Sequence, residues 1–573
     1  MRFSIFYEHQ LPRPWQADSE HRLLQEALEQ VALADRLGFD AVWAVEHHFL
    51  EEYSHSSASG VFLAAASQRT KAIRLGFGIL PLPPGYQHPA RVAEKAATLD
   101  LVSDGRVELG TGETSSGAEL GGFRVDRDTK RAQWSEALEV VARMMVETPF
   151  AGVDGDHIKM PPRNVIPKPL QKPHPPLWVA CSRRETIRLA AEKGIGALSF
   201  AFVDPEEAAP WVDEYYDILT SDRCVPAGFA VNANVALALP MMVHEDEAEA
   251  IERGIDGAHF FGYALGHYYA FGEHQPGRTS IWEEFLARRE DAGFARSVIT
   301  ADDAPLGVKV LTNGLGSLRG AIGNPAQLRE LITRYEQAGV DELMFCLQTG
   351  KTKHEHIMEA LELFAAEVMP EFAGRRADRE RLKATRLGDA ERRALERRAP
   401  RQTVAKGYAF GAADGVEDQM PAREPRAPNA TFAALRSRLE DRGERAFRAF
   451  VARSDDARLA KTAGSGAGLK VLFGAMERQF VPERAGGFAG DIQYNLRAED
   501  GSVRSWTVAI DAARARARPG ESPEPKLTIT LAVADFVRIA GQDLDPVKAV
   551  LTGRMQLAGD FGVALKLGEM FGQ

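Results

Sequence analysis

The sequence predicts an α/β protein: a (β/α)8 barrel of the TIM type with insertions, followed by a separate small α+β domain. Short apolar runs alternate with helix-like segments eight times within residues 1–372. Polar residues follow several runs directly, as at the carboxyl edge of a parallel sheet. Beyond an arginine-rich stretch, single apolar and polar residues alternate instead, as in half-buried strands. A doubly wound sheet is the alternative, but it usually opens with a glycine-rich turn, which residues 8–18 lack.

The expected strands are short apolar runs separated by segments with helical spacing. The strands span residues 2–7, 40–45, 73–80, 107–110, 176–180, 197–201, 230–239 and 341–346. The first helix is closed by Gly38, a residue suited to the left-handed end of a helix. The helices span residues 19–37, 57–67, 89–101, 130–146, 184–193, 205–219, 325–338 and 353–368. We expect a hairpin in the proline-rich insertion at 148–175, and an irregular aromatic segment at 258–318 that forms a lid or a dimer contact.

Composition narrows the class of protein. The chain has 573 residues, 45% hydrophobic and 26% charged, which is typical of globular domains. Its net charge of −11 and the lack of a basic–aromatic pattern argue against nucleic-acid binding. Three widely spaced cysteines suggest no disulfide framework and a cytoplasmic protein. The first residues read as a strand and not as a signal peptide. No apolar run approaches the roughly 18 residues of a membrane span.

The second expected strand stops at three titratable residues, Glu46, His47 and His48. An imidazole exchanges a proton near neutral pH, which makes His47 the candidate acid–base group, with Glu46 as a residue that could orient it. Neighbours on an extended strand point to opposite faces, so the two histidines do not easily share an ion, and we expect no metal. Capping or surface positions are the simpler alternative for such a motif.

The rest of the chain divides into two parts. Residues 373–430 are charged and polar, which predicts a linker that is helical at its start. Residues 431–573 form a separate module, in which apolar and polar residues alternate around Tyr494, Val508 and Ile529 as in half-buried strands. Helices are expected at 432–451, 469–479, 533–540 and 546–551, and a last strand at 552–560. An ordinary core and an apolar pocket for a lipid-like ligand both remain open.

Four blocks, in this order and spacing, carry a resemblance to a known family. They read WAVEHHF at 43–49, HPAR at 88–91, LD and SDGR within 99–106, and KPHPPLWVA at 172–180. With them, residues 1–372 resemble the bacterial-luciferase-like flavin-dependent monooxygenases. Residues 431–573 resemble a sterol-carrier-protein-type lipid-binding domain, chiefly through the closing Gly553, Gly559 and Asp560.

The resemblance implies a barrel that holds reduced FMN at its carboxyl face. Its phosphate would lie at the turn after the fifth strand, where a helix N-terminus, a hydroxyl and arginines meet. This turn comprises Ala180, Cys181, Ser182, Arg183 and Arg184. Luciferase-like relatives carry a Cys–Arg pair in the loop after the fourth strand, where this chain has Gly112 and Glu113. Arg183 or Arg184 must therefore replace the missing arginine, and luciferase-like light emission is not expected.

Three further residues are assigned to the cofactor by the resemblance. Arg131 begins the helix after a glycine-rich loop and matches a cofactor-binding arginine. Ser199 matches a position that contacts the flavin ring. Gly78 matches a strand segment that lies against the flavin and can carry a non-prolyl cis bond, with ordinary strand geometry as the alternative.

The activity implied by the resemblance is monooxygenation. Reduced FMN from a separate flavin reductase would react with O2 and oxygenate an apolar organic substrate, by hydroxylation, aldehyde oxidation or a Baeyer–Villiger reaction. His47 would be the acid–base group near the flavin, and Glu46 would support the flavin or His47. A deazaflavin-dependent hydride-transfer oxidoreductase and a lipid carrier with a vestigial barrel remain as alternatives. Barrels of this family often pair, so a homodimer is a further expectation.

Overall fold

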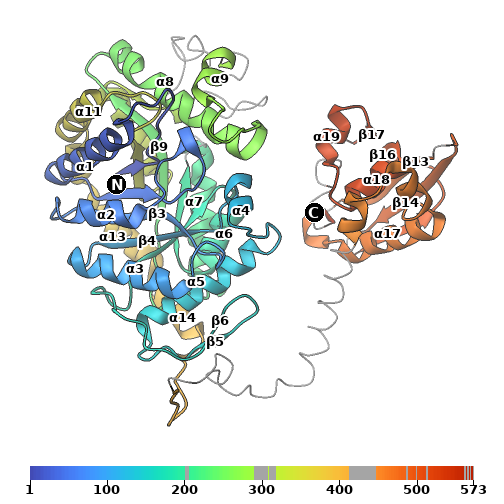
Figure 1. The fold of residues 1–573 in the computed structure, drawn as a ribbon, viewed down its shortest axis with the longest axis horizontal. Coiled ribbons are helices and arrows are strands. Elements are labelled where there is room, and N and C mark those ends of the chain that lie inside the picture. Colours follow the sequence, from blue (N-terminus) through green and yellow to red (C-terminus); the bar gives the residue numbers. More distant parts are fainter. Residues whose placement is uncertain are drawn as a thin grey trace. The chain divides into compact units, whose positions relative to one another are not determined.

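The computed structural model describes most of the chain in two compact units, Met1–Pro421 and Ala422–Gln573 (Figure 1). The described residues are 1–200, 205–289, 307–308, 318–411, 447–485, 488–498, 500–511 and 514–560, with 563, 567, 570 and 571. The first unit is a ring of strands wrapped in helices, and the second is a sheet with helices. In the part of the chain that is described, no helix is both long and apolar enough to cross a membrane.

Eight parallel strands close into a barrel, which confirms the predicted fold class. They are β1 (Arg2–Tyr7), β2 (Ala41–Val45), β3 (Arg74–Pro81), β4 (Val107–Gly112), β7 (Leu177–Cys181), β8 (Gly196–Phe200), β9 (Val235–Val243) and β12 (Glu342–Cys346). They pair in this order, and β12 pairs with both β9 and β1 to complete the ring. Because every pairing is parallel, all eight carboxyl ends lie at one mouth of the barrel.

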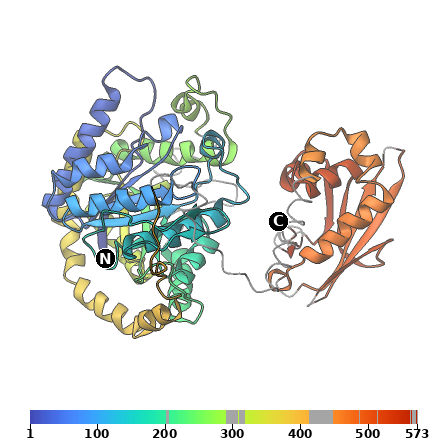
Figure 2. The same ribbon diagram turned by 60° about the horizontal axis from the view of Figure 1, so that its bottom comes forward.

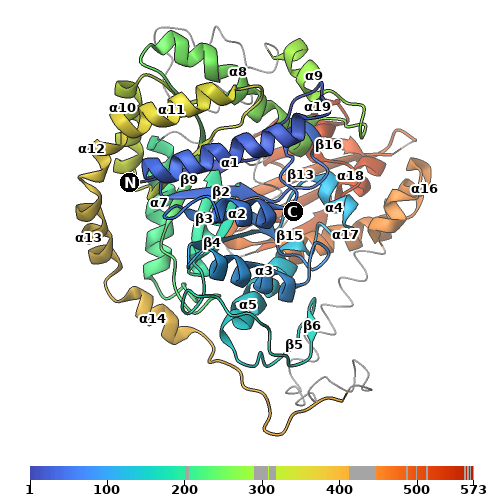
Figure 3. The same ribbon diagram turned by 60° about the vertical axis from the view of Figure 1, so that its left-hand side comes forward.

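Helices form the outer layer, as Figures 2 and 3 show. They include α1 (Ser19–Leu37), α2 (Ser59–Ser67), α3 (Pro89–Val102), α5 (Lys130–Val146), α6 (Arg184–Glu192), α7 (Pro205–Thr220), α10 (Pro325–Gln337) and α11 (His354–Glu367). Each matches an expected helix to within two residues at either end. The first ends as predicted at Gly38, whose φ of 87° is left-handed. The insertion forms the expected hairpin from β5 (Val153–Asp154) and β6 (Lys159–Met160).

Two tryptophans fill the barrel near its amino-terminal end. The rings of Trp43 and Trp178 meet edge to face, with centroids 5.3 Å apart. A Cβ atom on Gly76 would lie 2.2 Å from the Trp43 ring, and one on Gly196 would lie 2.2 Å from the Trp178 ring. Glycine at these two strand positions therefore makes room for the large side chains of the neighbouring strands.

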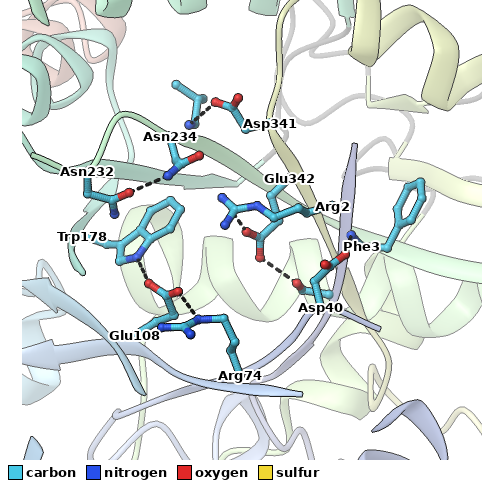
Figure 4. Close-up of polar contacts among 12 residues, drawn as sticks. Arg2, Phe3, Asp40, Arg74, Glu108, Trp178, Asn232, Asn234, Asp341 and Glu342 are labelled. Atoms are coloured by element: carbon cyan, nitrogen blue, oxygen red, sulfur yellow. Dashed lines mark hydrogen bonds and ion pairs between the residues drawn. The ribbon is translucent and has the colours of Figure 1, made fainter. Parts of the chain in front are cut away.

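A buried carboxylate, Glu342, helps to close this amino-terminal floor (Figure 4). Its Oε1 atom accepts hydrogen bonds from Ser4 Oγ at 2.7 Å and from Trp43 Nε1 at 2.8 Å. Its Oε2 atom lies 3.1 Å from an Nη atom of Arg2. Both oxygens of this carboxylate therefore have partners, one of them a guanidinium group.

Glu108 is the second buried carboxylate of the floor (Figure 4). One of its oxygens accepts from Arg74 and the other from Trp178 Nε1 at 2.7 Å. Burial raises the pKa of Glu108, although the positive charge of Arg74 opposes this. The floor thus pairs each of these glutamates with an arginine and with an indole N–H group.

The start of the predicted linker is helical and lies against the barrel. It follows α12 (Met369–Ala373) and forms α13 (Arg376–Leu387) and α14 (Ala390–Arg397). From α13, Lys383 forms an ion pair with Asp341 at 2.9 Å, and Arg379 donates to the carbonyl of Val340 at 2.9 Å. From α14, Arg397 donates to the carbonyl of Cys224. Residues 373–397 therefore act as a strap under the barrel floor.

The prediction of an irregular segment at 258–318 is wrong for much of its described part. A long helix, α8 (Glu247–Gly266), runs into a π-helical turn, η2 (His267–Phe271), and α9 (Ile281–Arg288) follows. A strand, β11 (Leu318–Gly323), then pairs in parallel with β9 outside the ring. Several glycines among aromatic residues hide the periodicity of α8 in the sequence. The remainder of the segment falls outside the described residues.

The second unit contains a five-stranded sheet in the order β15-β14-β13-β16-β17. Its strands are β13 (Gly490–Arg497), β14 (Val503–Ile510), β15 (Ala515–Pro519), β16 (Pro525–Ala532) and β17 (Met555–Gly559). The predicted alternation is confirmed, because Tyr494, Val508 and Ile529 are all buried. Strand β15 was not predicted, because its alanines and arginines carry little apolar signal.

Three of the four helices expected in the second unit are present. They are α17 (Gly466–Gln479), α18 (Val533–Ala540) and α19 (Pro546–Leu551). The expected helix at 432–451 falls mostly outside the described residues. An aromatic group joins helices and sheet: the ring of Phe473 stacks on those of Trp506 and Phe536, at centroid distances of 4.5 and 5.0 Å.

Candidate functional site

The mouth of the barrel brings together the two sequence stretches singled out above. Glu46 and His47 follow β2, and Ser182 and Arg183 follow β7. Strands β2, β3, β4 and β7 are consecutive and parallel, so both stretches lie on the same rim. The structure therefore satisfies the central geometric expectation of the sequence analysis.

His47 is buried between two carboxylates, with 8% of its surface exposed. Its Nδ1 atom donates to Glu119 Oε1 at 3.2 Å, and its Nε2 atom lies 3.8 Å from Glu8 Oε2. Burial alone lowers the pKa of His47, but the two carboxylates outweigh it and raise this pKa to about 9. His47 is therefore an imidazolium at neutral pH, and not the freely titrating imidazole that we expected.

Glu119 anchors one side of the His47 ring. It belongs to a short helix, α4 (Gly117–Gly122), that the sequence did not predict. Its carboxylate also accepts from Thr114 Oγ1 at 2.7 Å and from the backbone N–H of His48 at 3.0 Å. Burial raises the pKa of Glu119, but the charge of His47 and these hydrogen bonds outweigh it, so that this pKa is lowered. Glu119 is therefore a permanent anion at neutral pH.

Glu8 faces the other side of the ring, directly after β1. It is 3% exposed, and its Oε1 atom accepts from the hydroxyl of Tyr53 at 3.0 Å. Burial raises the pKa of Glu8 to about 7, although His47 and Tyr53 both oppose the shift. Glu8 was not among the predicted site residues, although it is the first polar residue after an apolar strand and so carries the same signal as Glu46.

Glu46 occupies a different environment from His47, as the alternation of an extended chain requires. Its carboxylate accepts from Ser59 Oγ at 2.8 Å and lies 3.5 Å from Lys95 Nζ. The residue that hydrogen-bonds and orients His47 is Glu119. Of the two roles expected of Glu46, the orientation of His47 therefore belongs to Glu119, and support of the flavin stays a prediction.

The turn after β7 is exposed where a phosphate would be expected. Ser182 and Arg183 are exposed and precede α6, and Arg184 is held by Glu214 at 2.6 Å. No ion pair involves Arg183 among the described residues. Of the two arginines proposed to replace the missing one, Arg183 is therefore the better placed to meet an anion.

Arg131, the other expected phosphate contact, is held by two carboxylates. It donates to Glu113 at 3.0 Å and to Glu185 at 2.7 Å. Glu113 is the residue for which the resemblance led us to expect an arginine, and it engages Arg131 instead. A phosphate at this turn would have to compete with Glu113 and Glu185 for Arg131.

The remaining predicted residues support the rim from within the strands. Ser199 Oγ donates to the carbonyl of Cys181 at 2.9 Å and so joins β8 to β7. Cys181 is buried, which raises the pKa of its thiol, and Ala180 beside it is half-buried. These contacts fix the strand ends that present Ser182 and Arg183.

Gly78 lies at a bulge of β3, where the register with β2 and β4 shifts. A Cβ atom there would approach the backbone of Ala44 and Val45 to 3.0 Å, which explains the absence of a side chain. Every cis peptide bond in the described residues precedes a proline, so of the two alternatives for Gly78 the structure has ordinary strand geometry and not a cis bond.

Aromatic side chains from η2 and α8 cover the space beside His47. Tyr53 lies between 6.0 and 6.4 Å, centroid to centroid, from the rings of Phe261, Tyr268 and Tyr269. Tyr53 ends a three-residue 3-10 turn, η1 (Glu51–Tyr53). In this turn Glu52 accepts from the backbone N–H groups of Ile281 and Trp282, at the start of α9. The aromatic segment, for which a lid and a dimer contact both stay predictions, is therefore attached to the site through η1.

Metal chemistry has no support in the described part of the chain. No group of three or more histidine, cysteine, aspartate or glutamate side chains there is arranged to hold an ion.

Comparison with protein families identifies both units. A model of the luciferase-like monooxygenases matches residues 1–342, more than half of the chain. This chain belongs to the luciferase-like monooxygenase family. A second model, of the SCP-2 sterol transfer family, matches residues 473–572. The resemblances noted in the sequence for both parts are confirmed.

Known relatives support the first assignment. The protein y4wF of Sinorhizobium fredii is 34% identical over 228 residues, which cover 40% of this chain and 64% of that protein. The oxygenase component of flavin-dependent trigonelline monooxygenase from Acinetobacter baylyi is 25% identical over 386 residues, 66% of this chain and 98% of that protein. The monooxygenase RslO1 of Streptomyces bottropensis has the same fold, with a TM-score of 0.51 and 24% identity over 65% of this chain and all of that one.

Proposed function

We propose that this protein is the oxygenase component of a two-component monooxygenase, which uses reduced FMN and O2 to oxygenate an apolar organic substrate. The main observation is that one rim carries both a buried, charged His47 and the exposed turn of Ser182 and Arg183. The trigonelline enzyme supports the proposal, because it is an oxygenase component that matches almost along its whole length.

The donor set of the rim fits FMN. The turn of Ser182 and Arg183 offers a hydroxyl, a guanidinium and the N-terminus of α6, which suit a phosphate. In the segments that follow β1 and β4, Glu8 Oε2 and Ser116 Oγ are buried polar atoms without a hydrogen-bond partner among the described residues. Such atoms are expected where a polar ligand completes a site. Arg131 would join the phosphate after leaving Glu113 or Glu185.

Reduced FMN, when bound, supplies the electrons that activate O2. In this proposal His47 holds a proton at the mouth and Glu119 fixes the orientation of the imidazole. Gly78 is the position of β3 that the resemblance places against the flavin. The aromatic cover from η2 excludes water, which would otherwise favour wasteful release of hydrogen peroxide.

The decisive experiment is to load the protein with reduced FMN, admit O2 and screen apolar carbonyl compounds for oxygenated products by mass spectrometry. His47→Ala should bind reduced FMN with little change and lose about 100-fold or more in turnover, as expected for a proton-transferring group. Reduced deazaflavin should give no oxygenated product. If only the deazaflavin turned over, without O2 uptake, the enzyme would be a hydride-transfer oxidoreductase.

The substrate class follows from the second unit. We propose that residues 431–573 bind the apolar substrate and deliver it to the barrel in residues 1–372, with residues 373–430 as the connection. The SCP-2 match and the apolar group of Phe473, Trp506 and Phe536 support this. Deleting residues 431–573 should raise the KM for a long-chain substrate and leave the KM for a short one unchanged. Equal kinetics for both chain lengths would remove the proposed role.

A further inference from the structure

We propose that Glu8 is a positioning residue that shares one exchangeable proton with His47, so that the pair can hold the proton on either side at the mouth of the barrel. The catalytic meaning of this proposal rests on the monooxygenase function proposed above. The proton exchange itself is a property of the protein without cofactor.

The two oxygens of Glu8 have different surroundings. Oε1 accepts from the hydroxyl of Tyr53 at 3.0 Å. Oε2 is buried, has no hydrogen-bond partner among the described residues, and faces Nε2 of His47 at 3.8 Å. The imidazole is fixed from behind by Glu119 at 3.2 Å. Oε2 is thus the oxygen that is left free to accept a proton from Nε2 after a movement of less than about 1 Å into hydrogen-bond range.

The charges around Glu8 favour neither its ionised nor its protonated form strongly. Within the described residues, His47 is the cation that forms an ion pair with it. The other titratable groups that interact with Glu8, from η1, α4, η2 and β12, are neutral or negative at neutral pH: Tyr53, Glu119, Tyr269 and Cys346. A buried carboxylate with one titratable cation and a nearby anion keeps a proton more readily than one paired with arginine.

The proton transfer conserves charge within the pair. In one direction the Nε2–H bond of His47 breaks and an O–H bond forms at Glu8 Oε2, so that an ion pair becomes a neutral imidazole and a neutral acid. The raised pKa values of both groups, about 7 for Glu8 and about 9 for His47, fit a pair that retains a proton near neutrality. Glu119, whose pKa is lowered, stays charged and holds the ring in place during the exchange.

The test is an NMR titration of the cofactor-free protein labelled with 15N-histidine, with the His47 signal assigned from His47→Gln. The His47 ring should report two inflections, its own and one near neutral pH from Glu8. In Glu8→Gln, which keeps an acceptor for Tyr53, the inflection near neutrality should vanish and the His47 midpoint should fall by about one pH unit or more. An unchanged His47 titration in Glu8→Gln would overturn the proposal.

Two further variants provide an independent test and a control. Tyr53→Phe removes a hydrogen bond that favours ionised Glu8, so the inflection near neutrality should move to higher pH; no movement would contradict the proposal even if Glu8→Gln failed to fold. Glu20→Gln is the matched control, because Glu20 contacts His55 at 3.0 Å in an exposed histidine–glutamate pair. It should leave the His47 titration unchanged, and a shift there would mean that the readout is unspecific.

A kinetic measurement separates this inference from the proposed function. With reduced FMN bound, the rate of its reoxidation by O2 should show a pH dependence near neutrality that Glu8→Gln lacks. If the NMR inflections behave as described but FMN does not bind, the proton sharing stands and the proposed cofactor is wrong. If FMN binds and both pH dependences persist in Glu8→Gln, the proposed function survives and the role of Glu8 fails.

Discussion

The two ends of the barrel use buried glutamates in different ways. At the floor, Glu342 and Glu108 each have an arginine and an indole N–H group as partners, and both oxygens of each carboxylate are engaged. At the mouth, Glu8 has a histidine and a tyrosine as partners, and one of its oxygens lacks a hydrogen bond among the described residues.

The difference lies in the partner and not in the burial, because Glu8, Glu108 and Glu342 are all almost inaccessible. A guanidinium stays charged at every relevant pH, so it always opposes protonation of a glutamate beside it. An imidazole can gain or lose its charge, so a glutamate beside it keeps a proton within reach of neutral pH. Partner choice therefore separates a carboxylate that closes the barrel from one that can take part in proton transfer.

The floor should lose the most stability when its pairing is broken. Glu342→Ala leaves Arg2 without its buried partner and removes the acceptor of Ser4 and Trp43. We expect the free energy of unfolding of the barrel to fall by about 3–5 kcal/mol. Urea unfolding followed by tryptophan fluorescence measures this, and a loss below about 1 kcal/mol would mean that the floor is not a structural ion pair.

The mouth should instead make stability depend on pH. The pKa of His47 is about 9 in the fold against 6.5 ordinarily, so its contribution is complete below pH 6.5 and is lost as the pH rises through 9. The pKa of Glu8 is about 7 in the fold against 4.5 ordinarily. Its contribution to stability is therefore also lost as the pH rises, over the lower range from about 4.5 to 7. In His47→Gln we expect the decline in the free energy of unfolding between pH 6.5 and 9 to be smaller by about 3 kcal/mol. Parallel urea titrations across this range are the check, and equal slopes for both proteins would contradict it.

A smaller effect should follow from neutralising the other neighbour of His47. Glu119→Gln keeps a side chain that can contact Thr114 but removes the negative charge next to Nδ1. The pKa of His47 should decrease by about one pH unit or more, and the histidine NMR titration would show it directly. If the titration of His47 were unchanged, the raised pKa of His47 would be due to Glu8 and not to Glu119.

The smallest change should come from a carboxylate outside both regions. Glu214 holds Arg184 and Arg188 on the exposed surface beside α6. In Glu214→Gln the free energy of unfolding should change by less than about 1 kcal/mol, because water screens exposed pairs. The same variant frees Arg184, so a gain in FMN affinity, measured by fluorescence quenching, would indicate that this arginine too reaches the phosphate.

The sequence was sufficient for the barrel because each strand is a short apolar run and the periodicity of its helices is plain. It also placed His47 at the mouth of the barrel, because His47 is the second residue after a strand. It failed for α8, where glycines and aromatic residues blur the helical spacing. It could not predict the contact between Glu119 and His47. Glu119 follows β4 and His47 follows β2, and nothing in the local sequence of either indicates that the two side chains are neighbours. The pKa of His47 depends on that meeting, so only the folded arrangement reveals it.

The η1 turn gives the site a mechanical link as well as a chemical one. Glu52 holds the first N–H groups of α9, and Tyr53, the next residue, donates to Glu8. A guest molecule that displaced α9 would shift Glu52, and the backbone would pass that shift on to the phenol of Tyr53. Entry of a molecule into the barrel would then change how readily Glu8 releases its hydrogen ion.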